Sequence, residues 1–351
     1  MAMVDVEIEG GGIFGLSVAF ACARRGAHVR LHERRRIGAG ASGGVVGALA
    51  PHAPDAWNEK KQFQLESLAM APAFWAQVAE LSGLDPGYAR LGRLMPLATE
   101  RAVALARGRI AEAERNWRGI ARWSVVDTAA PWKLDSPTGY HVSETLSARL
   151  HPRAALKALA AAARALGAEI EEGATRPVGR GRAVVEATGW EGLVALGQET
   201  GVEVGSGVKG QAALLRADFR RRPQLFVDGL HIVPHADGTT AIGSTSERSF
   251  AHPDATDAAL DELLERARRI CPELASVPVI GRWAGVRPRA ATRAPLLGPH
   301  PRENGRFIAN GGFKIGFGVA PLVGEVMADL VLEGRAERIP DAFRTERLFA
   351  G

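Results

Sequence analysis

A glycine-rich turn near the N-terminus is the feature that most restricts the fold. The sequence Gly10-Gly11-Gly12-Ile13-Phe14-Gly15 follows a short apolar run over 4–8, which is typical of a buried parallel strand. An alanine-rich segment over 16–25 then predicts a helix that ends at Gly26, and a second strand is expected over 28–32. This order of strand, glycine turn, helix and strand predicts a Rossmann-like unit that binds a dinucleotide.

Each conspicuous residue of this unit has a physical role. Gly10 permits the tight turn, Gly12 allows a pyrophosphate to approach the backbone, and Gly15 lets the helix pack closely on the strand. The free N–H groups and the positive end of the helix dipole favour the phosphate charge. Glu33 lies 18 residues after Gly15, where an acid that binds a ribose hydroxyl is expected. The glycine motif alone does not distinguish NAD from FAD.

Further glycine-rich segments follow in a characteristic order. They are GAGASGG over 38–44 with VVGALAPH over 45–52, VVEATGWEG over 184–192, LHIVPHADGTTAIGSTSE over 230–247, WAGVRPRAATRAPLLG over 283–298, and RFIANGGFKIGFGVAP over 306–321. Together with the N-terminal motif, these segments resemble the family of D-amino acid oxidase and glycine oxidase. The resemblance implies an enzyme that binds FAD and oxidises a small amine or amino acid by moving a hydride from the α-carbon to the flavin, after which the imine hydrolyses.

The resemblance also implies which residues contact the cofactor. Relatives with covalent flavin use a cysteine near the C-terminal region, and Cys271 is not in that context, so we expect non-covalent FAD. The expected FAD-contacting residues are Gly10, Gly12, Ile13, Phe14, Gly15, Glu33, Arg34, Ala41, Ser42, Gly43, Gly47, Ala48, Leu49, Thr188, Gly189, Gly312, Phe313, Lys314, Ile315 and Gly316.

The implied fold class is α/β with an α+β substrate part. A discontinuous Rossmann-like FAD-binding domain would comprise 1–55, 140–200 and 290–351. A second domain built on an antiparallel sheet would comprise 56–139 and 201–289. Within it, an Asp-Gly turn over 237–238 predicts a hairpin.

Four residues are candidates for the substrate end. A substrate carboxylate calls for a fixed cation, and the planar fork of arginine grips it with two hydrogen bonds. Arg287 matches the family's carboxylate-binding arginine, although an arginine here could also pair within the fold. Lys314 stands in a turn where relatives commonly carry a histidine and an arginine; it could serve the flavin, the substrate or oxygen, or be an exposed lysine. His231 could line the pocket or pair across the sheet, and His52 is similarly open.

Composition limits the partners. The net charge of +5 is carried by scattered arginines without a clustered stripe, so nucleic acid is not an expected partner. Two cysteines, Cys22 and Cys271, provide no metal-ligand spacing, and we expect no metal. The N-terminus carries no charged-then-apolar leader, and no apolar run reaches membrane-spanning length, so we expect a cytoplasmic protein. The partners would be a small amine and oxygen or another electron acceptor. The sequence does not indicate an oligomeric state.

Two other functions stay open at this point. One is a flavin oxidase that modifies tRNA by acting on a carboxymethyl-amine, which the basic pI of about 9.6 permits. The other is a flavoprotein subunit with little activity of its own, which the altered turn Gly312-Phe313-Lys314 permits.

Overall fold

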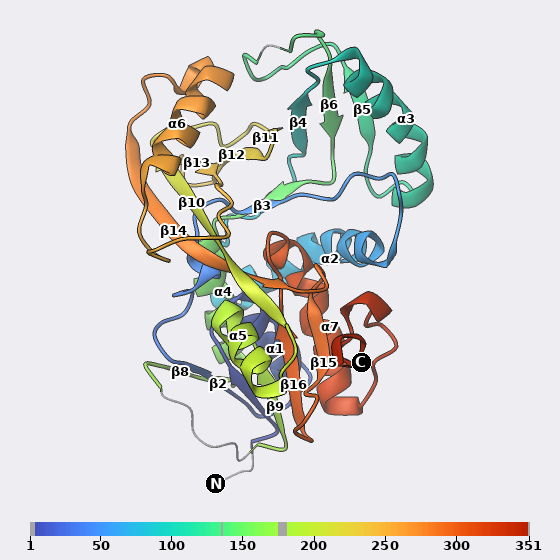
Figure 1. Cartoon of the computed structure of the whole chain (residues 1–351), viewed down its shortest axis with the longest axis vertical. Helices are drawn as coiled ribbons and strands as arrows, with labels where there is room; N and C mark the ends of the chain where they lie inside the picture. The colour runs from blue at the N-terminus through green and yellow to red at the C-terminus, as the bar shows by residue number, and fades with distance from the viewer. Residues whose placement is uncertain (1–3, 135, 175–180, 350–351) are drawn as a thin grey trace.

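A mostly parallel sheet lies at the base of the molecule (Figure 1), and its strand β1 (Val6–Glu9) leads directly into the N-terminal glycine motif. The computed structural model of the chain describes residues 4–134, 136–174 and 181–349. β1 pairs in parallel with β2 (Val29–Glu33) and β9 (Ala183–Glu186), and β15 (Leu296–Pro299) joins the far edge in antiparallel orientation to β16 (Arg306–Asn310). In spatial order, the strands of this first sheet within the described residues are β15 (Leu296–Pro299), β16 (Arg306–Asn310), β9 (Ala183–Glu186), β1 (Val6–Glu9), β2 (Val29–Glu33) and β8 (Glu169–Glu172).

Helices bury the first sheet. α1 (Ile13–Arg24) packs against α7 (Gly316–Glu333) and α4 (Pro152–Ala165), so it is buried on nearly every face, as its alanine-rich sequence allows. α2 (Glu59–Ser82) lies against α7 and α4, while α5 (Gly189–Thr200) packs against strands β10 and β14 of the second sheet. The short strands β3 (Ala48–Leu49) and β7 (Ala148–Arg149) pair with each other, and α8 (Glu346–Phe349) is the last helix described.

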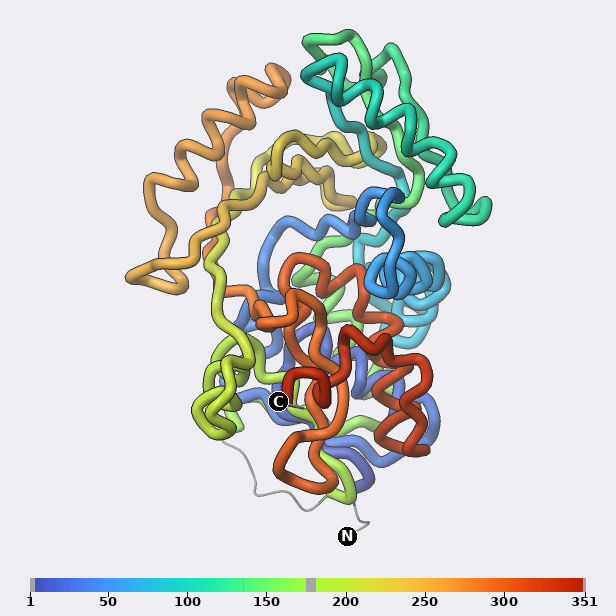
Figure 2. Tube along the Cα trace, turned by 45° about the vertical axis from the view of Figure 1, so that its right-hand side comes forward, coloured from blue at the N-terminus to red at the C-terminus, as the bar shows by residue number. Residues whose placement is uncertain are grey.

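A second, curved sheet forms the upper part of the molecule. Its neighbours are antiparallel except for β11 and β4, which run parallel. Figure 2 shows α6 (Ala258–Ile270) and α3 (Glu100–Trp117) flanking its two ends. Among the described residues, its strands in spatial order are β14 (Val279–Ala290), β10 (Gly205–Leu215), β13 (Thr240–Gly243), β12 (Leu230–Pro234), β11 (Gln224–Val227), β4 (Arg93–Pro96), β6 (His141–Glu144) and β5 (Trp123–Val126).

The predicted fold class is confirmed, as is the hairpin, because β12 and β13 pair across the turn that contains Gly238 (φ +84°). The division into domains stays a prediction, and two elements pair or pack across its boundaries. β6 begins at His141, inside the segment assigned to the FAD domain, yet it pairs with β4 and β5 in the second sheet. α2, assigned to the substrate domain, packs on helices of the first sheet. A local sequence pattern predicts that a strand or helix forms, but it does not predict which other strand or helix that element contacts.

No helix in the described part of the chain is both long and apolar enough to span a membrane. The two cysteines are buried and unbridged. Burial raises the pKa of the Cys22 thiol to about 12 and that of Cys271 to about 11, so both remain protonated and unreactive near neutral pH.

Candidate active site

A cavity of about 950 Å³ connects the two sheets. One end lies at the carboxyl ends of β1, β2 and β9, which finish at Glu9, Glu33 and Glu186. This is where open α/β sheets bind their ligands. The other end is lined by residues of the second sheet and by the turn before α7, and we call it the Arg287 end. Its lining includes Arg93, Phe226, His231, Ser244, Trp283, Arg287 and Lys314.

The N-terminus of α1 opens onto the first end of the cavity. Gly12 is the N-cap and offers no side chain to the helix, while the N–H of Ile13 donates to Ser42 Oγ at 3.0 Å. A Cβ on Gly12 would lie 3.2 Å from the same Oγ, so the absence of a side chain keeps this approach open. Gly10 has a φ of +110°, which favours glycine. Backbone N–H groups and the helix dipole thus converge where a pyrophosphate would sit.

Glu33 is fixed beside this helix start. Its Oε2 accepts from the N–H of Gly11 at 2.8 Å, and its Oε1 accepts from the N–H of Arg35 at 2.9 Å. Because a carboxylate oxygen can accept more than one hydrogen bond, both oxygens retain capacity for ribose hydroxyls. The arrangement matches the role that the 18-residue spacing predicts.

The lining fits FAD along its length. Of the residues predicted to contact the cofactor, all but two line the cavity. Gly15 and Gly43 are the exceptions: a Cβ on Gly15 would lie 1.9 Å from Gly10 O, and a Cβ on Gly43 would lie 1.9 Å from Gly38 O, so both glycines allow close backbone packing. Their contact with FAD stays a prediction. Arg34 lines the cavity and also forms an ion pair with Glu191 of α5.

Arg287 dominates the second end. Its side chain leaves β14 and is 8% exposed. Nη2 donates to Ser244 Oγ at 2.7 Å and to Thr245 O at 3.1 Å, whereas Nη1 has no hydrogen-bond partner among the described residues. Burial lowers the pKa of Arg287 to about 10, against the opposing effect of Glu247, so the guanidinium stays charged at neutral pH. Arg287 Nη1 is therefore a fixed, charged N–H group in the cavity wall that is available to a ligand.

Three other predicted residues lie in the same wall. Lys314 is exposed to solvent, yet partial burial lowers its pKa, and the charges of Arg287 and Arg289 lower it further. Burial, together with the charges of Arg93, Lys314 and Arg287, lowers the pKa of His231 to about 3, so this imidazole is neutral. It packs against Phe226 with ring centroids 4.6 Å apart.

His52, the third of these residues, lies 2.6 Å from Gln64 Oε1 through its Nδ1, and burial lowers its pKa. The structure brings these predicted residues together around one cavity. Their catalytic roles remain proposals.

Sequence reasoning missed several lining residues, among them Gln64, Arg93, Phe226, Ser244 and Trp283. Trp283 and Ser244 stand inside segments that the family resemblance had already marked, so a signal for them existed. Arg93 stands in no motif; it lies on β4 and forms a buried ion pair with Glu144, with 3.0 Å between Nε and Oε1. Gln64 is one position of a long helix and faces the cavity through tertiary packing alone.

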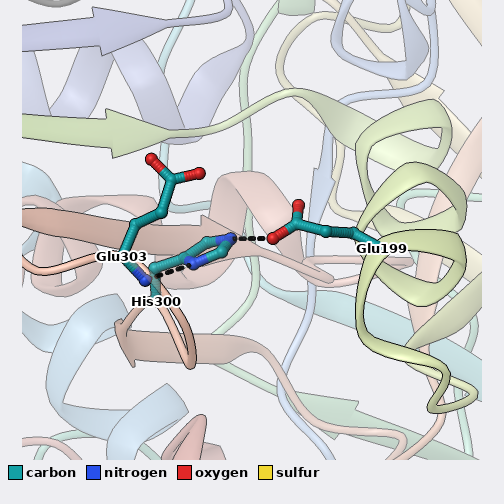
Figure 3. A group of neighbouring side chains, drawn as sticks. All are labelled: Glu199, His300 and Glu303. Carbon is teal, nitrogen blue, oxygen red and sulfur yellow. Dashed lines mark hydrogen bonds and ion pairs between the residues drawn. The ribbon is translucent and has the colours of Figure 1, made fainter.

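One group of described residues has the composition of a metal site: Glu199, His300 and Glu303 (Figure 3). The hydrogen bonds of His300 favour a proton on its Nε2 rather than a metal ion at this position. His300 Nδ1 accepts from the backbone N–H groups of Arg302 and Glu303, at 3.3 and 3.2 Å. The proton of a neutral ring is therefore on Nε2, which lies 3.7 Å from Glu199 Oε1. The predicted absence of a metal stays a prediction.

The comparison with known families decides the assignment. Residues 5–330 match DAO, the family described as FAD dependent oxidoreductase. This chain belongs to that family. A glycine oxidase of Geobacillus kaustophilus is 27% identical, over 93% of this chain and 92% of that protein. The crystal structure of a glycine oxidase from Geobacillus kaustophilus is also similar, with a TM-score of 0.82 and 27% sequence identity. The match covers 93% of this chain and 94% of that one.

A bifunctional protein ThiO/ThiG of Trichormus variabilis is 27% identical over 98% of this chain, but the match covers 55% of that longer protein. With the family established, the predictions of bound FAD and of an oxidoreductase are confirmed. The individual FAD contacts remain predictions that the shape of the cavity supports.

Proposed function

We propose that this FAD-dependent enzyme oxidises a small amine that carries a carboxylate, and that Arg287 anchors the carboxylate. The observation that carries the proposal is Arg287 Nη1, a buried and charged N–H group in the cavity wall without a hydrogen-bond partner among the described residues. Leaving such a group unsatisfied is costly, and a carboxylate is the ligand that a guanidinium fork satisfies best. The similarity to glycine oxidases supports the same substrate class.

The remaining lining suits amine oxidation. When bound, FAD accepts the hydride that leaves the α-carbon of the neutral amine; the resulting imine then takes up water and splits into a carbonyl compound and an amine or ammonia. Positive charges on Arg287 and Lys314 disfavour a charged ammonium nearby, so they hold the substrate amine in its reactive neutral form. Trp283 and Phe226 provide apolar walls that exclude water around the reacting carbon.

The first test is anaerobic reduction of the purified yellow protein. Glycine, sarcosine, D- and L-amino acids and simple amines are added in turn, and bleaching of the flavin band reports hydride transfer. We expect amines with a carboxylate to bleach the band at far lower concentrations than simple amines. Readmitting air then shows whether oxygen restores the colour. Equal reduction by amines with and without a carboxylate would contradict the anchor.

The anchor is tested separately by Arg287→Met. Losing a charge-assisted hydrogen bond should raise the KM for the carboxylate-bearing amine about tenfold to a hundredfold, with FAD content unchanged, and Arg287→Lys should recover part of the loss. The matched control is Arg293→Met, because Arg293 belongs to the same segment but is exposed outside the cavity. If Arg287→Met lost FAD and substrate binding together, the assignment would be wrong.

A further inference from the structure

Charges are segregated along the cavity. Six glutamates line it: Glu9, Glu33, Glu186, Glu191, Glu199 and Glu303. Each belongs to a strand of the first sheet, to α5, or to the connection between β15 and β16. Two of the cationic residues near them are paired, since Arg34 pairs with Glu191 and Arg306 pairs with Glu186. At the Arg287 end, by contrast, no described lining residue carries a carboxylate.

Lys314 stands beside Arg287 at this end. The backbone N–H of Phe313 donates to Pro288 O at 3.0 Å, which ties the turn that carries Lys314 to the residue that follows Arg287 on β14. Lys314 Nζ lies over the ring of Phe313, 5.6 Å from its centroid. No hydrogen bond or ion pair joins Nζ to another described residue, and its charged neighbours are the cations Arg287 and Arg289.

Two buried cations near this end, Arg93 and Lys209, are already neutralised within the fold. Arg93 pairs with Glu144, whose side chain is fully buried behind the wall. Lys209 Nζ lies 3.0 Å from Asp257 Oδ2 and 3.6 Å from Glu247 Oε2. Lys314 is exposed and has no such partner among the described residues, so a bound anion would supply the opposite charge at this end. Two cationic side chains that face one cavity without an acid favour an anion more strongly than a single arginine does.

We propose that the substrate is an amine with two carboxylates, one held by Arg287 Nη1 and the other by Lys314 Nζ. The proposal rests on the proposed function, in which Arg287 anchors the first carboxylate. Nη2 of Arg287 is already engaged by Ser244 and Thr245, so the free hydrogen-bonding capacity of this side chain in the cavity centres on Nη1. A second carboxylate would therefore be recognised by Lys314, which as a mobile point charge tolerates a range of spacings.

The test compares ligands that cannot be oxidised. Acetate carries one carboxylate, whereas malonate and succinate carry two. Their binding to the FAD-loaded protein is measured by calorimetry and by the perturbation of the flavin absorbance. We expect the dicarboxylates to bind at least about tenfold more tightly than acetate, as a second charge-assisted hydrogen bond implies. Similar dissociation constants for acetate and both dicarboxylates would overturn the proposal without using any variant.

Variants then locate the second site. Lys314→Met should weaken dicarboxylate binding about tenfold to a hundredfold and acetate binding less than about threefold, while Lys314→Arg should retain the preference. The matched control is Lys133→Met, because Lys133 is exposed and does not line the cavity. An equal loss for both ligand classes would show that Lys314 shares a single carboxylate with Arg287, and this would overturn the proposal.

The same experiments separate this inference from the proposed function. If no amine reduces the flavin but dicarboxylates bind in a manner that depends on Lys314, amine oxidation fails and the dianion site stands. If glycine and sarcosine reduce the flavin as efficiently as aspartate and N-carboxymethylglycine do, and Lys314→Met leaves all four unchanged, amine oxidation stands and the second carboxylate site fails.

Discussion

The absence of a side chain at Gly210 determines where the guanidinium of Arg287 can lie. Gly210 lies on β10 beside β14, and a Cβ there would lie 1.6 Å from Arg287 Nη2. Gly210→Ala must therefore displace the guanidinium from Ser244 and Thr245. We expect the KM for a carboxylate-bearing amine to rise about tenfold or more, because the anchor loses its charge-assisted hydrogen bonds, while FAD content stays the same. Steady-state kinetics and the flavin absorbance of the purified variant measure both quantities.

The control for this prediction lies on the neighbouring strand. A Cβ on Gly281 of β14 would approach Leu214 Cβ at 3.6 Å, an ordinary van der Waals contact. Gly281→Ala should therefore leave the KM unchanged. A Gly210→Ala enzyme with an unaltered KM would show that Arg287 can anchor substrate from another rotamer.

Residues of the site were predictable where a motif fixes the backbone. Gly12 and Glu33 follow from the strand, turn and helix pattern, because a dinucleotide would contact the main chain or the end of a strand there. Arg287 followed from its segment. Arg93 and Gln64 were not predictable, because each reaches the cavity through partners far away in the sequence: Glu144 for Arg93, and the backbone of His52 and Ala50 for Gln64. No local pattern encodes such long-range packing.

At the scale of elements, α1 and α7 form the most extensive contact between two helices in the described part of the chain, and both begin at the cavity. A Cβ on Gly324 of α7 would lie 2.5 Å from Ser17 O of α1. Gly324→Ala must push the two helices apart, so we expect it to lower the free energy of unfolding by about 1–3 kcal/mol and to weaken FAD retention. Chemical denaturation and a titration of the apoprotein with FAD measure the two effects.

A second helical glycine provides a control of opposite sign. Gly108 lies on the exposed face of α3, and a Cβ there would meet no atom within 4 Å. Gly108→Ala should raise the free energy of unfolding by about 0.5–1 kcal/mol, because alanine favours the helix, and should leave FAD binding unchanged. Equal stability of the two alanine variants would contradict the close packing of α1 on α7.

The existence of the elements was more predictable than their partners. The helix predicted over 16–25 begins at Ile13, since the glycine turn itself forms the first helical turn. The strand at 28–32 was placed almost residue for residue. The pairing of β6 with β4 and the packing of α2 on α7 were not predicted, because periodicity shows which face of an element is apolar but not which surface covers it.

The whole molecule is held together partly by neutral histidines at the junction of its two sheets. His235 follows β12 and is fully buried; its Nε2 donates to Val46 O at 3.1 Å in the loop that lines the cavity. The ring of His151 packs against it with centroids 4.8 Å apart. Burial lowers the pKa of His235 to about 4 and, together with nearby cations, lowers that of His231 to about 3. Charging either ring would place a cation in the packed junction.

These histidines make stability depend on pH in a defined direction. Below a pH of about 6.5 the unfolded chain takes up protons on both rings, whereas the folded chain does not until a much lower pH, so the free energy of unfolding must fall as the pH drops from 6.5 towards 4. His235 alone should contribute a loss of about 1 kcal/mol between pH 7 and pH 5.5. Thermal denaturation at closely spaced pH values should show the melting temperature decreasing through this window.

The contribution of His235 to the pH dependence of the free energy of unfolding can be measured with the variant His235→Asn. The variant is expected to be less stable at pH 7, because it loses the packed ring, but its stability should decline less steeply between pH 7 and pH 5.5, because the unfolded chain has one protonation site fewer. The decisive quantity is therefore the slope and not the absolute melting temperature. A slope equal to that of the natural protein would mean that His235 is protonated in the folded state, and that the two sheets tolerate a buried charge at their junction.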